Sequence, residues 1–448
     1  MWGKVKQMAK EKNMASLLAN MSAAFLGLVS FMLLARQLNK NDFGHWVLFI
    51  TLATFFDLLR FGLTRTSSVR LLSNANDDGA KKILGTCFKI NSILLLGITI
   101  GCYMLIFILG WLSIEIGEGY RLFLMWYPVL GIANLSWNNA MGLFEARQEF
   151  SKMMYVRIAN VGLFVTFLMV NGIWLNLDLY QIIWVYLVVN LISSLWCTLK
   201  KWDGLWYLGK HDKTVQAEII GFGKYSMGTL IGSSLLRSAD TFIIGLSPFM
   251  GAEAIAMYAI PIKLTDLLGI PLRSFTMTAY PKMSKKFIQQ DLEGVKRLFY
   301  QYTGVITLLF MPIAFFCYVL AEYLILFLGG GEYLQELPLL IVVFRIFTLY
   351  TLLLPLDRLL GVLMDSINRP KLNLIKVLVM TIANILLDLL AVFIFESLVM
   401  VAIGTVAFTV IGILLGIYML KREIGIKSGL IWTESLAFCK NLKLGSYL

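Results

Sequence analysis

Eleven charged residues lie well inside apolar stretches of the sequence that are long enough to cross a membrane. The bases are Arg60, Arg237, Lys263, Arg273, Arg345 and Arg358, and the acids are Asp57, Asp240, Asp266, Asp357 and Asp388. At the centre of a lipid-facing helix each charge costs about 2.5 to 3.5 kcal/mol. We therefore expect these side chains to face water, a ligand or one another. Because bases outnumber acids, the set favours an anionic ligand.

The spacing of the charges allows two interpretations. Three pairs of opposite sign stand three residues apart, Asp57 with Arg60, Arg237 with Asp240 and Lys263 with Asp266. Residues at this spacing meet on one helix face, so each acid can simply neutralise the neighbouring base. The alternative is a central, water-filled, cationic cavity between two halves of the protein, with the six bases as binding residues. We favour the cavity, although Arg60 is also placed to snorkel to the inner surface.

Two further groups of residues are candidates for the site. The five acids are candidates for gating, or for binding a coupling ion, H⁺ or Na⁺, if one is used. Asn134, Asn138 and Asn139 in one apolar segment are candidates for contacts with sugar hydroxyls, although amides between membrane helices also serve packing. The five cysteines and two histidines show no paired spacing of a zinc site. We expect no metal and no other cofactor.

Twelve apolar segments must position these residues. Seven are free of charge, namely 14–35, 90–110, 122–144, 158–177, 179–199, 298–321 and 397–420. Five carry charges, near 43–64, 225–247, 252–278, 337–363 and 372–395. A helix of about 20 residues spans the hydrocarbon core, and 58% of the residues are hydrophobic. The sequence therefore predicts an all-α polytopic membrane protein with twelve transmembrane helices.

The net charge of +12 reflects the orientation of the chain in the membrane and does not indicate nucleic-acid binding. Most Lys and Arg residues fall in the amino-terminal tail and in alternate loops, while the opposite loops hold only Arg36, Lys40 and Arg121. Cytoplasmic loops are the ones enriched in such bases. Both termini are therefore predicted to be cytoplasmic.

A polar segment, 200–218, divides the chain into an amino-terminal lobe (1–199) and a carboxy-terminal lobe (219–420) of six helices each. Six is an even number, so both lobes start from the cytoplasm, as in a parallel repeat with a pseudo-two-fold axis. Ile158-Ala159-Asn160 recurs as Ile382-Ala383-Asn384. The tail, 421–448, is predicted to lie on the inner surface as an amphipathic helix.

Several short motifs carry a resemblance to a known family. They are Leu33-Leu34-Ala35-Arg36-Gln37-Leu38, Asp42-Phe43-Gly44, Asp57 with Phe61-Gly62-Leu63, Arg237-Ser238-Ala239-Asp240, Ile243-Ile244-Gly245, Ala256-Met257-Tyr258, Tyr280-Pro281 and Gly331-Glu332-Tyr333. With them the chain resembles the Wzx-type O-antigen or polysaccharide flippases, which belong to the multidrug, oligosaccharidyl-lipid and polysaccharide exporter superfamily. The resemblance covers nearly the whole chain, and its degenerate motifs identify the superfamily better than the substrate.

The resemblance implies a V-shaped, MATE-like pair of six-helix lobes that alternates between inward and outward openings. Its substrate would be an undecaprenyl (polyprenyl) pyrophosphate carrying an oligosaccharide, moved across the bacterial inner membrane for O-antigen or capsule assembly. The implied partners are membrane lipids, a polysaccharide polymerase and the chain-length machinery. Cavity bases of relatives match Arg60, Arg237, Lys263 and Arg273. The first helix departs from the family pattern because it has no charge before Arg36.

Two alternatives remain beside the flippase. A multidrug or cation antiporter of the same superfamily is expected to have an acid-dominated cavity, against which six bases argue. An enzyme such as a polysaccharide polymerase, an O-antigen ligase or a membrane glycosyltransferase would need acceptor and donor sites at the outer surface, and the outer loops are short, the longest being 111–119 and 329–336. The sequence has neither a phosphate-binding Gly-Lys-Ser/Thr loop nor paired metal-binding histidines. We therefore predict a transporter and not an enzyme. Two extra carboxy-terminal helices found in lipid II flippases are not expected here, which argues against a peptidoglycan precursor.

Overall fold

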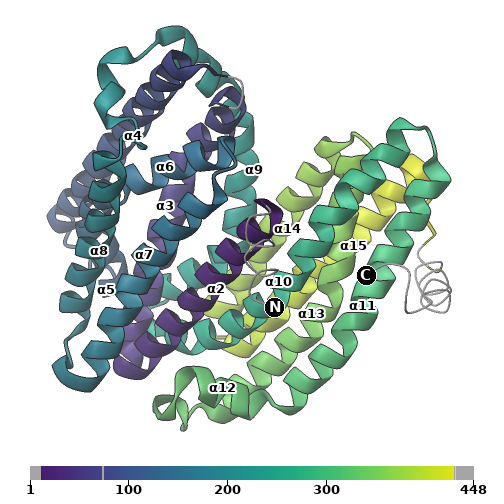
Figure 1. Cartoon of the computed structure of the whole chain (residues 1–448). Coiled ribbons are helices and arrows are strands. Elements are labelled where there is room, and N and C mark those ends of the chain that lie inside the picture. The colour runs from purple at the N-terminus through teal and green to yellow at the C-terminus, as the bar shows by residue number, and fades with distance from the viewer. Residues whose placement is uncertain (1–11, 73–74, 428, 430–448) are drawn as a thin grey trace, which may run out of the picture. The chain divides into compact units, whose positions relative to one another are not determined.

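The computed structural model describes residues 12–72, 75–427 and 429, and every regular element within them is helical (Figure 1). In chain order the elements are α2 (Lys12–Gln37), α3 (Lys40–Leu72), α4 (Asp77–Trp111), α5 (Glu118–Ala133), α6 (Leu135–Ala146), α7 (Phe150–Val170), η1 (Asn171–Leu175), α8 (Leu179–Leu199), η2 (Leu205–Lys210), α9 (Lys213–Leu246), α10 (Gly251–Ile288), α11 (Leu292–Val319), α12 (Ala321–Gly329), η3 (Gly331–Tyr333), α13 (Leu337–Ser366), α14 (Pro370–Phe393) and α15 (Leu398–Ile424). The predicted all-α class is confirmed.

Nine helices in the described part of the chain are long and apolar enough to cross a membrane: α3, α4, α7 with η1, α8, α10, α11, α13, α14 and α15. The other three predicted spans correspond to α2, α9 and the pair α5 and α6. The segment 122–144 is thus not one helix, because α5 ends at Ala133 and α6 begins at Leu135. Asn134 at the junction uses its side chain to bind residues of α3.

The chain packs as two compact units. Unit 1 comprises Met1–Ser234 and Gly251–Ala256, and unit 2 comprises Leu235–Met250 and Met257–Leu448. The division falls within α9, and the predicted lobe boundaries remain a prediction. The segment 200–218 contains η2, whose backbone lies against α4 so closely that a Cβ on Gly85 would stand 2.1 Å from the Tyr207 carbonyl oxygen. The predicted tail helix lies almost entirely outside the described residues.

The two units repeat the same chain connections. The side chain of Asn76 accepts a hydrogen bond from the Gly79 amide at the start of α4, at 2.8 Å. Asp291 does the same with the Gly294 amide at the start of α11, also at 2.8 Å. Such side chains satisfy an amide that the first helical turn leaves unpaired. Corresponding helices therefore begin in the same way in both halves.

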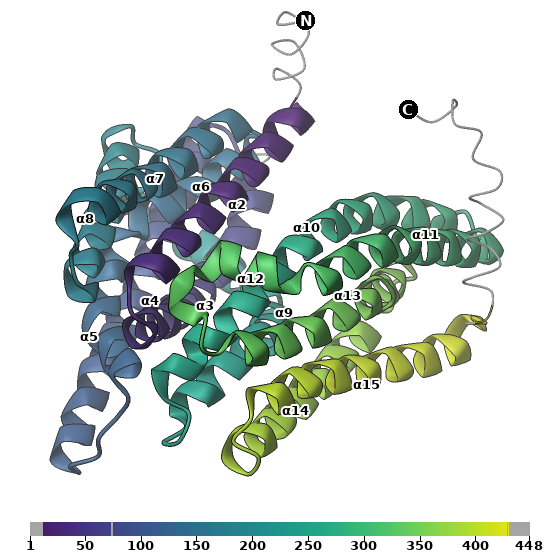
Figure 2. The same cartoon turned by 90° about the horizontal axis from the view of Figure 1, so that it is seen from below.

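The turns between helices repeat as well. Gln148 between α6 and α7 and Asn368 between α13 and α14 both have positive φ, 54° and 58°. In each turn the next amide bonds back to a carbonyl five residues earlier. Equivalent neighbours also pack in the two units: α7 lies on α8 as α14 lies on α15, and α6 lies on α8 as α13 lies on α15. Figures 1 and 2 both show α14 and α15 side by side. The internal repeat predicted from the helix count is thus visible in the backbone.

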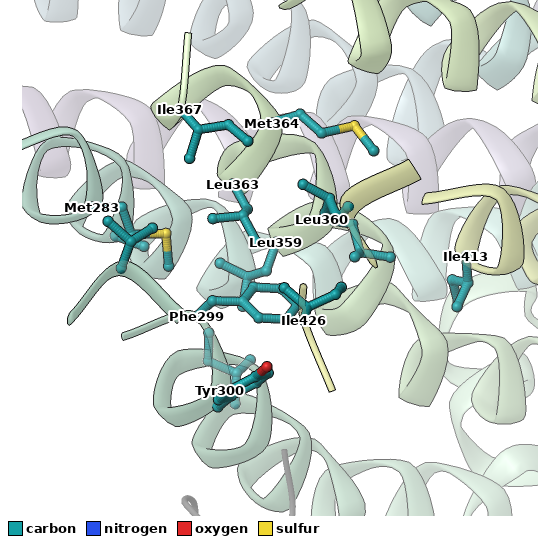
Figure 3. Packing of buried hydrophobic residues seen from close by; sticks show 14 of the residues in the cluster. Met283, Phe299, Tyr300, Leu359, Leu360, Leu363, Met364, Ile367, Ile413 and Ile426 are labelled. Carbon is teal, nitrogen blue, oxygen red and sulfur yellow. The ribbon is translucent and has the colours of Figure 1, made fainter. Parts of the chain in front are cut away.

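A hydrophobic cluster in unit 2 fixes α13 against α10 and α11. Met283 of α10, Phe299 of α11, and Leu359 and Leu363 of α13 are buried together (Figure 3). These α13 residues lie four positions apart and so form one face of the helix. Their burial sets the rotation of α13 and with it the directions of its neighbouring charged side chains, Asp357 and Arg358.

Candidate functional site

Arg60 is held inside unit 1 by three partners. Its side chain is 0% exposed. It donates to Asp57 Oδ1 at 2.8 Å, to the Gly131 carbonyl at 2.8 Å and to Asn134 Oδ1 at 2.5 Å. Asn134 Nδ2 in turn donates to Asp57 Oδ2 at 2.6 Å, and Tyr127 donates to Oδ1 at 3.0 Å. The pairing predicted from spacing therefore forms, and it joins α3 to the α5–α6 junction.

The three asparagines proposed as sugar contacts have different surroundings. Asn134 already uses both ends of its amide on Arg60 and Asp57. Asn138 and Asn139 line a small hollow in unit 1 together with Thr64 and Ser68. Asn139 is buried, and its Nδ2 has no hydrogen-bond partner among the described residues. Asn138 Nδ2 donates to the Asn134 carbonyl at 3.1 Å, and Asn139 Oδ1 accepts a hydrogen bond from Asn91 at 2.6 Å, so both amides also bond within the protein and their sugar contacts stay a prediction.

Arg237 pairs with a different acid from the one its spacing suggests. Its Nη2 lies 2.6 Å from Asp266 Oδ2, so the ion pair joins α9 to α10. Both side chains are accessible, at 60% and 36% exposure. Lys263 also interacts electrostatically with Asp266 and with Arg237. The structure therefore brings Arg237, Lys263 and Asp266 together, and pairing of Arg237 with Asp240 is not observed.

Two other bases of unit 2 are exposed inside apolar helices, Arg273 of α10 and Arg358 of α13. Helix α10 is continuous through Pro261 and Pro271, so Asp266 and Arg273, seven residues apart, lie on one face. Tyr350 is close enough to interact electrostatically with both Arg358 and Asp266. Arg345 has a different partner, Tyr318. Its Nε donates to the Tyr318 carbonyl, and its Cζ lies 4.7 Å from the centre of the tyrosine ring.

Asp240 and Asp388 form a buried acidic pair in unit 2. Asp240 accepts hydrogen bonds from the Tyr258 hydroxyl at 2.6 Å and from Asn384 Nδ2 at 3.1 Å, with Thr405 Oγ1 at 3.4 Å. Asp388 is fully buried and adjacent to Asp240. Both of its oxygens, and Asn384 Oδ1, have no hydrogen-bond donor in the described part of the chain. Three buried acceptor oxygens thus lie at this pair without a donor among the described residues, two of them on Asp388 itself and one on Asn384.

Sequence reasoning missed Lys376, the partner of Asp357. Its Nζ lies 2.6 Å from Asp357 Oδ1 and donates to the Asp357 carbonyl at 2.7 Å. The lysine is 3% exposed and its partner 9% exposed. Lys376 was missed because it stands near the start of its apolar segment, where a lysine usually belongs to the inner loop. Asp357 is therefore paired across α13 and α14.

The site and fold together define a multi-pass membrane protein with charged groups inside its helices. A family model described as "Polysaccharide biosynthesis protein" matches residues 33–338. The chain belongs to this family. A search of the curated proteins finds no match. The predicted resemblance to a polysaccharide family is thus confirmed at the level of the family.

Solved structures show the same fold at low sequence identity. An inward-facing MATE multidrug resistance transporter of the MOP superfamily is 14% identical, with a TM-score of 0.73 over 89% of this chain and 95% of that one. The lipid II flippase MurJ in an inward closed conformation is 14% identical, with a TM-score of 0.72 over 94% and 90%. A MOP transporter from Pyrococcus furiosus, whose binding pocket is described as reversed in polarity, is 14% identical, with a TM-score of 0.62 over 94% and 97%. The likeness establishes the fold and not the substrate.

Proposed function

We propose that this chain flips a polyprenyl (undecaprenyl) pyrophosphate-linked oligosaccharide from the inner to the outer leaflet of the bacterial inner membrane. The product would feed O-antigen or capsule assembly by a polysaccharide polymerase with its chain-length machinery. Both termini would be cytoplasmic, and transport would proceed by alternating access. The observation that carries the proposal is the exposure of Arg237, Arg273 and Arg358 within apolar helices of unit 2, in a member of a polysaccharide biosynthesis family.

Exposed bases in apolar helices need water or an anion, because a lipid-facing charge is too costly. A pyrophosphate supplies the complementary charge, and guanidinium groups bind phosphate oxygens in a bidentate manner. The membrane potential supports the direction of transport. Moving one charge through 100 mV contributes about 2.3 kcal/mol, so two negative charges moving outward gain roughly 4 to 5 kcal/mol.

Neutralising the exposed bases should stop transport. In proteoliposomes, Arg273→Gln and Arg358→Gln are each expected to slow leaflet exchange of a fluorescent polyprenyl-pyrophosphate oligosaccharide about 10- to 100-fold, since a charge-assisted hydrogen bond contributes about 1.5 to 3 kcal/mol. Arg369→Gln is the matched control. Arg369 is 59% exposed and pairs with Glu423 at 3.1 Å, much as Arg237 pairs with Asp266, but it lies in a predicted cytoplasmic loop.

Normal exchange in both variants would contradict the proposed binding role. Export of a cationic drug, with no exchange of the lipid by the unmodified protein, would instead establish the multidrug antiporter.

We further propose that a coupling ion, H⁺ or Na⁺, binds at Asp240 and Asp388. Asp240 has the uncharged partners Tyr258, Asn384 and Thr405, and the adjacent Asp388 has no donor among the described residues. Two adjacent buried carboxyl groups in such surroundings need a proton or a cation between them. Each orphaned buried acceptor otherwise costs about 1 to 3 kcal/mol. Intramembrane acids commonly serve such relays.

Removing one acid should therefore uncouple transport. Asp388→Asn is expected to abolish the response of leaflet exchange to an imposed Na⁺ or pH gradient, measured in the same proteoliposomes. Asp365→Asn is the control, because Asp365 is also an acid bonded to an amide, Asn373, in unit 2. If neither gradient changes the rate of leaflet exchange by the unmodified protein, Asp240 and Asp388 do not bind a coupling ion.

A further inference from the structure

Asp266 differs from the other intramembrane acids in its surroundings. Asp57 is held by Tyr127 and Asn134 as well as by Arg60, and Asp357 is buried against Lys376. Asp266 instead stands 36% exposed and faces two bases, Arg237 and Lys263. It is thus the most accessible of the paired intramembrane acids, and it occupies Arg237, one of the bases on which the proposed function depends.

We propose that Asp266 is a displaceable counter-ion that competes with the pyrophosphate for Arg237 and Lys263. This inference rests on the proposed function, because it names how the anionic group of that substrate is bound and released. In the empty site, the carboxylate relieves the repulsion between the two bases and holds Arg237 in place at 2.6 Å. When a pyrophosphate arrives, its oxygens take over the guanidinium and ammonium donors, and the carboxylate becomes a like charge beside the ligand.

The charge balance explains why a transporter benefits from such an acid. Two bases and one acid leave a net charge of about +1, which does not neutralise the two negative charges of a pyrophosphate. Without the acid, the two bases would match those charges and hold the substrate tightly. Tight binding of the ground state slows the steps that follow it. Asp266 thus lowers the affinity for the pyrophosphate and favours its release. When the substrate binds, the ion pair between Arg237 of α9 and Asp266 of α10 breaks.

The experiment measures binding of farnesyl pyrophosphate to the purified full-length protein in nanodiscs, with farnesol as the neutral probe. Asp266→Asn is expected to bind farnesyl pyrophosphate at least about tenfold more tightly and to leave farnesol binding unchanged, while leaflet exchange becomes slower. Asp266→Ser is the second variant, in case the asparagine impairs folding. Glu423→Gln, which breaks the matched pair with Arg369, is expected to change neither affinity.

The outcomes separate the two proposals. If the unmodified protein binds farnesyl pyrophosphate and both Asp266 variants bind it equally or more weakly, the counter-ion role is wrong and the flippase proposal stands. Suppose that the unmodified protein binds farnesol and farnesyl pyrophosphate equally well, and that Arg237→Gln changes neither affinity. The bases then do not contribute to binding of the anionic group. The proposed function then fails together with this inference.

Discussion

Replacing Arg60 by methionine is expected to lower the free energy of unfolding by about 3 to 5 kcal/mol, because it leaves Asp57 without its buried cation. The same change also removes the hydrogen bonds to Gly131 and Asn134. The measurement is thermal or denaturant unfolding of the purified protein in detergent. The matched variant is Arg237→Met, which removes an arginine of equal size from an accessible pair; accessible pairs contribute only about 0 to 1 kcal/mol.

A double variant tests the cause of the loss. In Arg60→Met with Asp57→Asn, no uncompensated charge remains, so part of the stability is expected to return. Equal stability of Arg60→Met and Arg237→Met would contradict this account.

The fold could be predicted because its dominant signal is local. Segment length and hydropathy decide whether a helix spans a membrane, and the described helices follow the predicted segments. The interruption at Asn134 could not be predicted in this way. It depends on α3, since the asparagine completes the hydrogen bonds of Arg60 and Asp57. Hydropathy does not register such a contact between distant segments.

The candidate site was only partly predictable, because spacing along one helix does not reveal partners on another. Asp57 with Arg60 and Arg237 with Asp240 have the same separation. The ion pair between Asp57 and Arg60 forms and is buried. Arg237 instead forms an ion pair with Asp266, and Asp240 accepts hydrogen bonds from Tyr258 and Asn384. Which of the two outcomes holds depends on the neighbouring helices. The sequence therefore identifies which residues are charged, while their division into buried and accessible groups required the structure.

The internal repeat places two lysines at equivalent positions. Asn160 and Asn384 stand in the recurring triplet, and eight residues before each of them is a lysine, Lys152 and Lys376. The two lysines occupy the same position in the repeat but have different surroundings. Lys152 pairs with Glu149 of its own helix start at 2.9 Å and is 44% exposed. Lys376 is buried against Asp357 of another helix, so the two halves use one position for different purposes.

The two lysines are expected to contribute very differently to stability. Lys376→Met is expected to lower the free energy of unfolding by about 3 to 5 kcal/mol, because it leaves Asp357 without its cation in the interior of unit 2. Lys152→Met, the same change at the repeat-related position, is expected to cost at most about 1 kcal/mol, since its pair is accessible. Unfolding of both variants in the same detergent gives the comparison.

The remaining question is whether the Lys376 pair serves the structure or the transport cycle. Adding Asp357→Asn to Lys376→Met should restore stability, because a buried pair replaced at both ends leaves no charge behind. If leaflet exchange also returns in this double variant, the pair acts only by fastening α14 to α13. If stability returns and exchange does not, Asp357 takes part in transport and joins Asp240 and Asp388 among the acids that the cycle uses. A Lys376→Met variant as stable as Lys152→Met would show instead that Asp357 finds another partner or a proton, and that the pair does not hold the two helices together.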